Sequence, residues 1–344
     1  MKSYVIGVGI AVCAFSLASR LVGQKDDHPF RDRSDTGAIV HVLPSPEVIG
    51  PRSGMRPTIA PDRPGLSVYG PSYGSGNLID HGGPQVSAAG FFAIYWNGSV
   101  ANAGGSVTSL GYATLQSQIS AFTALFADNS NYSQSDAGAD YTVIQQYGTS
   151  NAISSAPLSP VLTALGYYVD GKAAQASITD SKIQSYLKGL FQGGKIPVSS
   201  NVLYGVYFPA GMKITLQGGS SCSSFCGYHG HFAYNGVDVK YASFPYLNCS
   251  ACKLTALSVA DMLTIVTSHE IREAVTDPDL NAWYDSAGYE ADDKCAWHNL
   301  YQMANGGFWV QPEFSNGGTV TDALGFQTTY PQLSPGVGAC VVAK

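Results

Sequence analysis

The sequence predicts an α/β or α+β domain in which helices pack on a mixed sheet. Helix-like and strand-like apolar segments alternate along the chain, and a mostly apolar helix that carries charged residues comes late in it. Hydrophobic residues make up 45% of the 344 residues, which is enough to bury a core. We expect one main globular domain over residues 84–344, stabilised by disulfide bonds.

Regular structure is predicted from the start of that domain. The apolar run Ala88–Trp96 stops at an Asn-Gly pair and predicts a buried strand followed by a turn. Apolar residues at helical spacing predict a helix between Gly111 and Asp128. The segment Tyr141–Tyr147 then returns to strand character.

The second half of the domain continues the alternation. A helix is predicted over Thr179–Phe191 and a central strand over Val202–Phe208, where Pro209 ends it. Gly227–Tyr234 and Val237–Phe244 predict two strands or a hairpin.

The last predicted helix is the most informative element. It runs from Val259 to about Val275, and Ser258 with Asp261 forms a variant capping box at its start. Its apolar residues are numerous enough for the helix to be mostly buried, although it also carries His269 and Glu273.

The N-terminus predicts export. Lys2 precedes the apolar run Tyr4–Ala18, and small residues at Ser16 and Ala18 suit cleavage, so residues 1–23 are expected to be a signal peptide. An uncleaved membrane anchor is the alternative, but the run is shorter than the ~20 residues that span a bilayer. No second apolar stretch is long enough to span a membrane, and the protein is expected to be secreted, extracellular or periplasmic.

Residues 24–83 are expected to be a flexible arm or a pro-segment. They are rich in proline and glycine and show no sustained apolar period.

The composition of the whole chain limits which partners it can bind. A net charge of −6 without a basic cluster gives no electrostatic footprint for nucleic acid, and only 12% of the residues are charged, against roughly 25% in an average soluble domain.

The string His269-Glu270-Ile271-Arg272-Glu273 predicts a metal site. Residues four apart share a helix face, so His269 and Glu273 can bind the same ion, while Glu270 lies one step aside. In the His-Glu-x-x-His form of zinc hydrolases, two ligands hold the ion and the glutamate takes a proton from its bound water. Here a carboxylate, which is an acceptable zinc ligand, replaces the second histidine.

A third ligand is expected downstream, because catalytic zinc needs three protein ligands and an open position. We favour Asp293, which lies near a cysteine whose disulfide could fix its position. Glu290 could bind instead or orient His269 from behind, and Asp277 and His298 are further candidates.

Three alternatives stay open from the residues alone. The charged residues of the helix could be an ordinary polar face exposed to solvent. His229 and His231 would share one face of a strand and could bind a metal themselves, although histidines beside such a turn more often satisfy backbone groups. The tryptophans could form a sugar-stacking surface, but core packing is their more common use.

Six cysteines lie outside the leader, and an even number in an exported protein favours disulfides. We expect neighbours in the middle region to pair with each other and the last two cysteines to pair together. The two close pairs also resemble the halves of a zinc ribbon, which is the alternative. The six are Cys222, Cys226, Cys249, Cys252, Cys295 and Cys340.

The chain resembles the phosphate-induced, EXORDIUM-like protein family over most of residues 80–344. The matching pieces are Asp80–Pro84, Leu203–Pro209, Cys226–Gly230, Thr276–Pro278 and the acidic stretch that ends at Cys295. The resemblance implies a secreted, extracellular or wall-associated protein. Plant members lack the His-Glu pair, whereas the microbial branch carries His-Glu-x-x-Glu-x-x-Thr-Asp-Pro, so metal chemistry would belong to that branch.

Taken together, the sequence predicts a secreted, zincin-like metallohydrolase, most simply a zinc peptidase. Glu270 would be its general base, Zn²⁺ its cofactor, and His269, Glu273 and Asp293 the metal ligands. Its partner would be an extracellular peptide or protein substrate. The alternative is a non-catalytic extracellular or cell-wall-associated binding or signalling protein that contacts wall polysaccharide.

Overall fold

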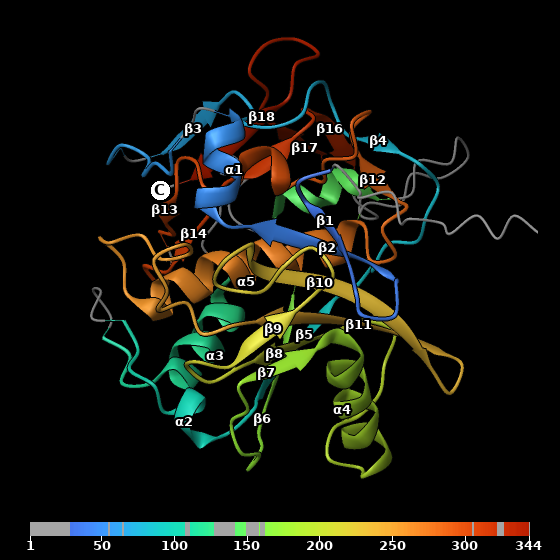
Figure 1. Cartoon of the computed structure of the whole chain (residues 1–344). Coiled ribbons are helices and arrows are strands. Elements are labelled where there is room, and N and C mark those ends of the chain that lie inside the picture. Colours follow the sequence, from blue (N-terminus) through green and yellow to red (C-terminus); the bar gives the residue numbers. More distant parts are fainter. Residues whose placement is uncertain are drawn as a thin grey trace, which may run out of the picture.

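A seven-stranded mixed sheet organises the chain in the computed structural model (Figure 1). The structure describes residues 28–53, 56–63, 65–106, 111–126, 142–148, 158, 162–304, 306–321 and 327–343. The expected signal peptide therefore lies outside the described residues. In spatial order the strands are β1 (Arg31–Arg33), β2 (Ile39–Pro44), β10 (Phe225–Tyr234), β11 (Val237–Phe244), β8 (Val202–Tyr207), β5 (Gly90–Tyr95) and β6 (Thr163–Val169).

The two halves of the sheet differ in strand direction. β1, β2, β10 and β11 are antiparallel neighbours, whereas β11, β8, β5 and β6 run parallel. Helices lie in the connections from β5 to β6 and from β6 to β8, whereas β8 leads to its parallel neighbour β11 through β10. The predicted α/β or α+β class with a mixed sheet is thus confirmed.

Helices cover both faces of the sheet. Along β10 the side chains alternate, so Tyr228 donates a hydrogen bond to Asp180 of α4 (Asp180–Gln192), while His229 faces Glu270 of α5 (Val259–Thr276). β8 shows the same division, because the Tyr207 hydroxyl lies 2.9 Å from the Thr267 hydroxyl of α5. The sheet is therefore the middle layer between α4 and α5.

Helix α5 forms where the sequence predicts it. The Ser258 hydroxyl accepts from the Asp261 amide and the Asp261 side chain accepts in return from the Ser258 amide, which completes the capping box. The helix ends at Asp277 because the following Pro278 disfavours helical backbone at that position. Its apolar side chains are buried, each contributing about 1.5–3 kcal/mol to folding.

The remaining elements surround these layers. Figure 1 places α4 at one end of the molecule and several small sheets at the other. The helices and strands outside the central layers are α1 (Pro46–Ser53), β3 (Leu66–Tyr69), β4 (Ile79–Asp80), α2 (Gly98–Ala101), α3 (Leu115–Leu125), η3 (Thr142–Tyr147), β7 (Ser177–Thr179), β9 (Lys213–Thr215), β12 (Trp283–Tyr284), η4 (Asp293–Cys295), β13 (Tyr301–Gln302), β14 (Trp309–Val310), β15 (Glu313–Ser315), β16 (Gly318–Thr321), β17 (Gln327–Tyr330) and β18 (Ala339–Ala343).

The predicted strand over Tyr141–Tyr147 is wrong for its described part, which is the 3₁₀ helix η3. Val143 and Tyr147 are buried four residues apart, together with Ile144, which is a helical spacing. A short apolar run does not by itself distinguish a strand from a helix. Here the buried residues have the spacing of a helix.

The expectation that residues 24–83 form a flexible arm is also wrong for their described part. β1 and β2 are strands of the central sheet, and β3 pairs with β18 from the other end of the chain, as Figure 1 shows. Phe30 and Leu43 are fully buried. Residue 84 is therefore not a domain boundary, and the N-terminal segment belongs to the folded core.

None of the helices in the described ranges has the length and apolar character needed to cross a membrane.

Candidate metal centre

Helix α5 brings the first half of the candidate centre into the interior. His269 Nε2 lies 2.9 Å from Glu273 Oε2, one helical turn away. Both side chains and those of Glu270 and Arg272 are completely buried. The alternative of a polar helix face exposed to solvent is therefore wrong.

Strands β2 and β10 add two histidines opposite this helix. His41 and His229 are direct cross-strand partners, and their rings stack with centroids 5.4 Å apart. His229 Nδ1 lies 3.1 Å from Glu270 Oε2 and 3.9 Å from Glu273 Oε2. The sheet thus presents two imidazoles to the polar residues of α5.

The loop around η4 supplies the remaining carboxylates. Asp293 Oδ2 lies 2.9 Å from His41 Nε2, and Glu290 Oε1 lies 2.8 Å from His41 Nδ1. The Asp293 amide donates to Glu273 Oε1 at 3.0 Å, and the Glu290 amide donates to Asp293 Oδ2 at 2.8 Å. These backbone bonds hold the loop against α5.

We call this group the His-carboxylate centre. Its members are fully buried and come from β2, β10, α5 and the η4 loop: His41, His229, His269, Glu270, Glu273, Glu290 and Asp293. The structure therefore brings the sequence-predicted ligands together, with His269 Nε2 4.0 Å from Asp293 Oδ1, and adds histidines from the sheet.

Glu273 Oε2 is the oxygen atom on which the imidazoles of the centre converge. Three imidazole nitrogens surround it, those of His269 at 2.9 Å and of His41 and His229 at 3.9 Å each. Ligands around tetrahedral zinc, at about 2.0–2.2 Å from the ion, lie roughly 3.3 Å from one another. These spacings therefore fit donor atoms that share a cation.

Hydrogen bonds within the protein do not satisfy the centre. Glu273 Oε2, Glu270 Oε1 and both oxygens of Glu290 have no aligned hydrogen-bond partner, and neither nitrogen of His269 has one. His41 Nδ1 is also unsatisfied despite its close approach to Glu290. A buried group left unpaired costs about 1–3 kcal/mol, and more when it is charged. The unsatisfied His269 Nε2 and Glu273 Oε2, which lie 2.9 Å apart, fit a bound cation, whereas the nearest nitrogens of His41 and His229 have carboxylate partners.

Burial governs the protonation of the centre. It lowers the pKa of His41 to about 4 and that of His269 to about 4, because the imidazolium loses its hydration. Burial, reinforced by the neighbouring carboxylates, raises the pKa of Glu270 and Glu273 well above the usual range. The neutral imidazoles are ready to act as ligands, and a divalent cation would favour the ionised carboxylates and release protons on binding.

Asp292, a buried carboxylate next to the centre, is paired with a protein cation. Arg272 donates to both oxygens of Asp292, with Nη2 2.7 Å from Oδ2, and lies 3.6 Å from Glu313. No lysine or arginine within the described ranges forms such an ion pair with Glu270 or Glu273, whose only ion-pair partners are histidines.

The other candidate ligands have different roles. Asp277 Oδ1 accepts from the amides of Asn281 and Ala282 and closes the turn after α5. His298 lies against Tyr73. Neither belongs to a group of converging ligands in the described part of the chain.

His229 and His231 do not share a site. His229 belongs to the buried centre, whereas the half-exposed His231 lies 2.9 Å from Asp238 Oδ1. There the Lys240 ammonium also binds Asp238 and lies 3.7 Å from Asp279, so a protein cation already pairs with these carboxylates.

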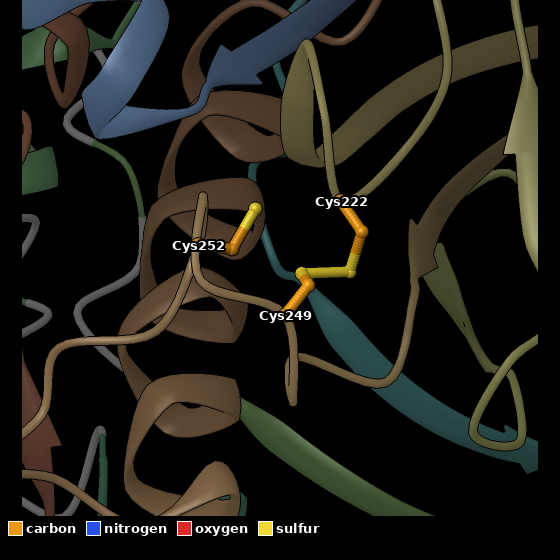
Figure 2. Close-up of side chains that lie close together, drawn as sticks. All are labelled: Cys222, Cys249 and Cys252. Carbon is orange, nitrogen blue, oxygen red and sulfur yellow. A yellow bond between two sulfur atoms is a disulfide. The ribbon is translucent and has the colours of Figure 1, made fainter.

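The cysteines form three disulfides. Cys295–Cys340 is as predicted, but the two close pairs are bonded across rather than within themselves, as Cys222–Cys249 and Cys226–Cys252. Figure 2 shows the Cys222–Cys249 bond with Cys252 beside it. Since all four sulfurs are bonded, the zinc-ribbon alternative is wrong.

The tryptophans offer no sugar-stacking surface. Trp96, Trp283 and Trp297 are buried, and Trp309 is partly buried against the core. Core packing is therefore their main use.

Sequence reasoning missed His41 as a member of the centre. The signal was present, because His41 is the one polar residue of β2 in an otherwise apolar run. It went unused because this part of the chain was expected to be an arm.

No protein-family model, curated protein or solved structure matches the chain. The resemblance to the EXORDIUM-like family stays a prediction.

Proposed function

We propose that this chain is an exported protein whose domain is held together by a divalent metal ion in the His-carboxylate centre. Zn²⁺ is the proposed ion, because imidazole and carboxylate are both zinc ligands. The proposed ligands are His41, His269, Glu273 and Asp293. The observation that carries the proposal is the set of imidazole nitrogens converging on Glu273 Oε2 in a site without a protein cation.

Complete burial favours a structural ion over a catalytic one. Structural zinc sites are closed by four protein ligands, whereas catalytic sites keep one position open to water and substrate. The proposed ligands are all inaccessible to solvent. This supports the class of non-catalytic extracellular or wall-associated proteins that the family resemblance implies. The disulfides are compatible with an oxidising compartment.

A metallohydrolase with a zincin-like layout is the second candidate. It is favoured by Glu270, whose Oε1 is unpaired beside the centre, as a general base would be. A bound cation would supply Lewis acidity at that point. A peptide could reach Glu270 only if the η4 loop moved away from α5.

Metal analysis of the purified, secreted chain tests the principal proposal. We expect one or more equivalents of a divalent metal, a loss of metal in Glu273→Gln, and no peptide hydrolysis by the wild type. Stoichiometric metal with hydrolysis that disappears in Glu270→Gln would replace the structural proposal with the hydrolase. Absence of metal from the secreted protein, with no uptake of added Zn²⁺, would refute both.

A further inference from the structure

The ligands of the His-carboxylate centre divide into two groups that share one residue. His41, Glu273 and Asp293 form one group, in which each residue offers an atom within 4.8 Å of the others. The second group consists of His229, Glu270 and Glu273. Glu273 is therefore common to both groups.

The histidine of each group has its own carboxylate partner besides Glu273. His41 Nε2 is bound to Asp293 of the η4 loop, whereas His229 Nδ1 lies 3.1 Å from Glu270 of α5. The two imidazole rings are stacked with their centroids 5.4 Å apart, and a nitrogen of each lies 3.9 Å from Glu273 Oε2. In proteins with two metal ions, the ions lie about 3.5–4 Å apart. A carboxylate between stacked histidines suits that spacing.

The number of carboxylates in the centre also favours two ions. The centre holds four carboxylates, those of Glu270, Glu273, Glu290 and Asp293, and their ion-pair partners among the described residues are histidines. With all four ionised, one divalent ion would balance only two of the negative charges, and unbalanced charges are costly in a protein interior. Two divalent ions would neutralise all four carboxylates.

Buried atoms of His229, Glu270 and Glu290 are also left unsatisfied. His229 Nε2, Glu270 Oε1 and both carboxylate oxygens of Glu290 lack aligned hydrogen bonds, although all three residues are fully buried. His229 Nε2 lies 3.9 Å from Glu290 Oε2. None of these atoms belongs to the first ligand group.

We infer that the centre binds two divalent ions, with Glu273 bridging them. The first is held by His41, His269 and Asp293, and the second by His229 and Glu270, with Glu290 beside them. This inference rests on the proposed metal centre and deepens it, because it assigns Glu270 to a ligand position.

Metal stoichiometry tests the inference on the full secreted chain. The protein is stripped with a chelator and reloaded with Zn²⁺ alone, and the bound zinc is measured after removal of the excess. We expect two zinc ions per chain in the wild type and one in His229→Gln. His231→Gln is the matched control, because it lies on the same strand outside the centre, and it should keep two ions.

Loading with Mn²⁺ gives a readout that depends on the bridge. Electron paramagnetic resonance should show magnetically coupled ions in the wild type and an isolated ion in His229→Gln. Glu270→Gln, which preserves side-chain volume, is the second variant if His229→Gln is not secreted, and it should also bind one ion.

Each outcome decides the question. One ion in the wild type, with uncoupled Mn²⁺, overturns the second site and leaves the proposed single-metal centre intact. Two ions that persist in both variants overturn the ligand assignment. No bound ion in the wild type overturns the centre itself.

Discussion

Replacing Glu273 by glutamine tests the residue on which the imidazoles of the metal centre converge, because the change keeps the side-chain volume and removes one negative charge. In the wild type, Glu273 Oε2 is 2.9 Å from His269 and 3.9 Å from His41 and His229. An amide at this place is a much poorer ligand for a divalent cation. The variant should therefore lose the stabilisation that the metal gives.

The size of that stabilisation follows from linkage. A free metal concentration 1,000 times its dissociation constant stabilises the folded state by about 4 kcal/mol. In a domain of this size each kcal/mol raises the melting temperature by roughly 2 °C, so the wild type should melt about 8 °C higher with Zn²⁺ than with chelator. Glu273→Gln should melt at nearly the same temperature in both.

The stability of the metal-free proteins distinguishes the loss of a metal ligand from a general loss of stability. Burial raises the pKa of Glu273, so the ionised side chain is costly without a cation. With chelator the variant should be at least as stable as the wild type, while with Zn²⁺ it should be the less stable of the two.

Differential scanning fluorimetry of the oxidised proteins measures all four melting temperatures. Glu47→Gln is the charge-matched control, since Glu47 is exposed on α1, and its response to Zn²⁺ should equal that of the wild type. The reasoning fails if the wild type does not respond to chelator, or if the variant loses equal stability with and without metal.

Three further substitutions test buried contacts, two near the centre and one on the opposite face of the sheet. In Gly227→Ala, the new Cβ would lie 2.4 Å from Val266 Cγ1, so α5 should shift from β10 and zinc affinity should fall roughly 10–100-fold in a competition titration. Asp285→Asn leaves the buried Lys294 ammonium without its partner at 2.7 Å and should cost about 3–5 kcal/mol in urea unfolding; an unchanged midpoint would contradict a buried ion pair. Burial raises the pKa of Asp180, so the folded state keeps its proton where the unfolded chain has lost it, and stability should fall as pH rises from about 4 through the raised pKa. Asp180→Asn should flatten that slope in unfolding curves measured across pH, and an unaltered slope would assign it to other groups.

The part of the centre on α5 was predictable because it depends on local geometry. Four residues of helix separate His269 from Glu273, and the capping residues at Ser258 fix where that helix starts. His41 was not predictable in this way, because it meets Asp293 across 252 residues of chain through the strand order of the sheet. Periodicity predicts elements and faces, but it does not order strands.

The disulfide pairing could have been predicted in part from the expected hairpin. Tyr228 pairs with Ser243 in the β10–β11 hairpin. The hairpin brings the start of β10 and the residues before it beside the segment after β11, and Cys222–Cys249 and Cys226–Cys252 both join these two parts. A predicted hairpin therefore already favours pairing across the two cysteine pairs over pairing within them.

The disulfides and the proposed metal centre act on the same elements in different ways. Cys226–Cys252 ties β10 to the segment before α5, and Cys295–Cys340 ties the η4 loop to β18, so β10 and the η4 loop each have a disulfide within three residues of a member of the centre. Strand β2 has no such link within the described residues and is held by its ladders to β1 and β10. Its one side chain in the centre is that of His41. The docking of β2 should therefore depend on the proposed cation more than that of β10 or the η4 loop.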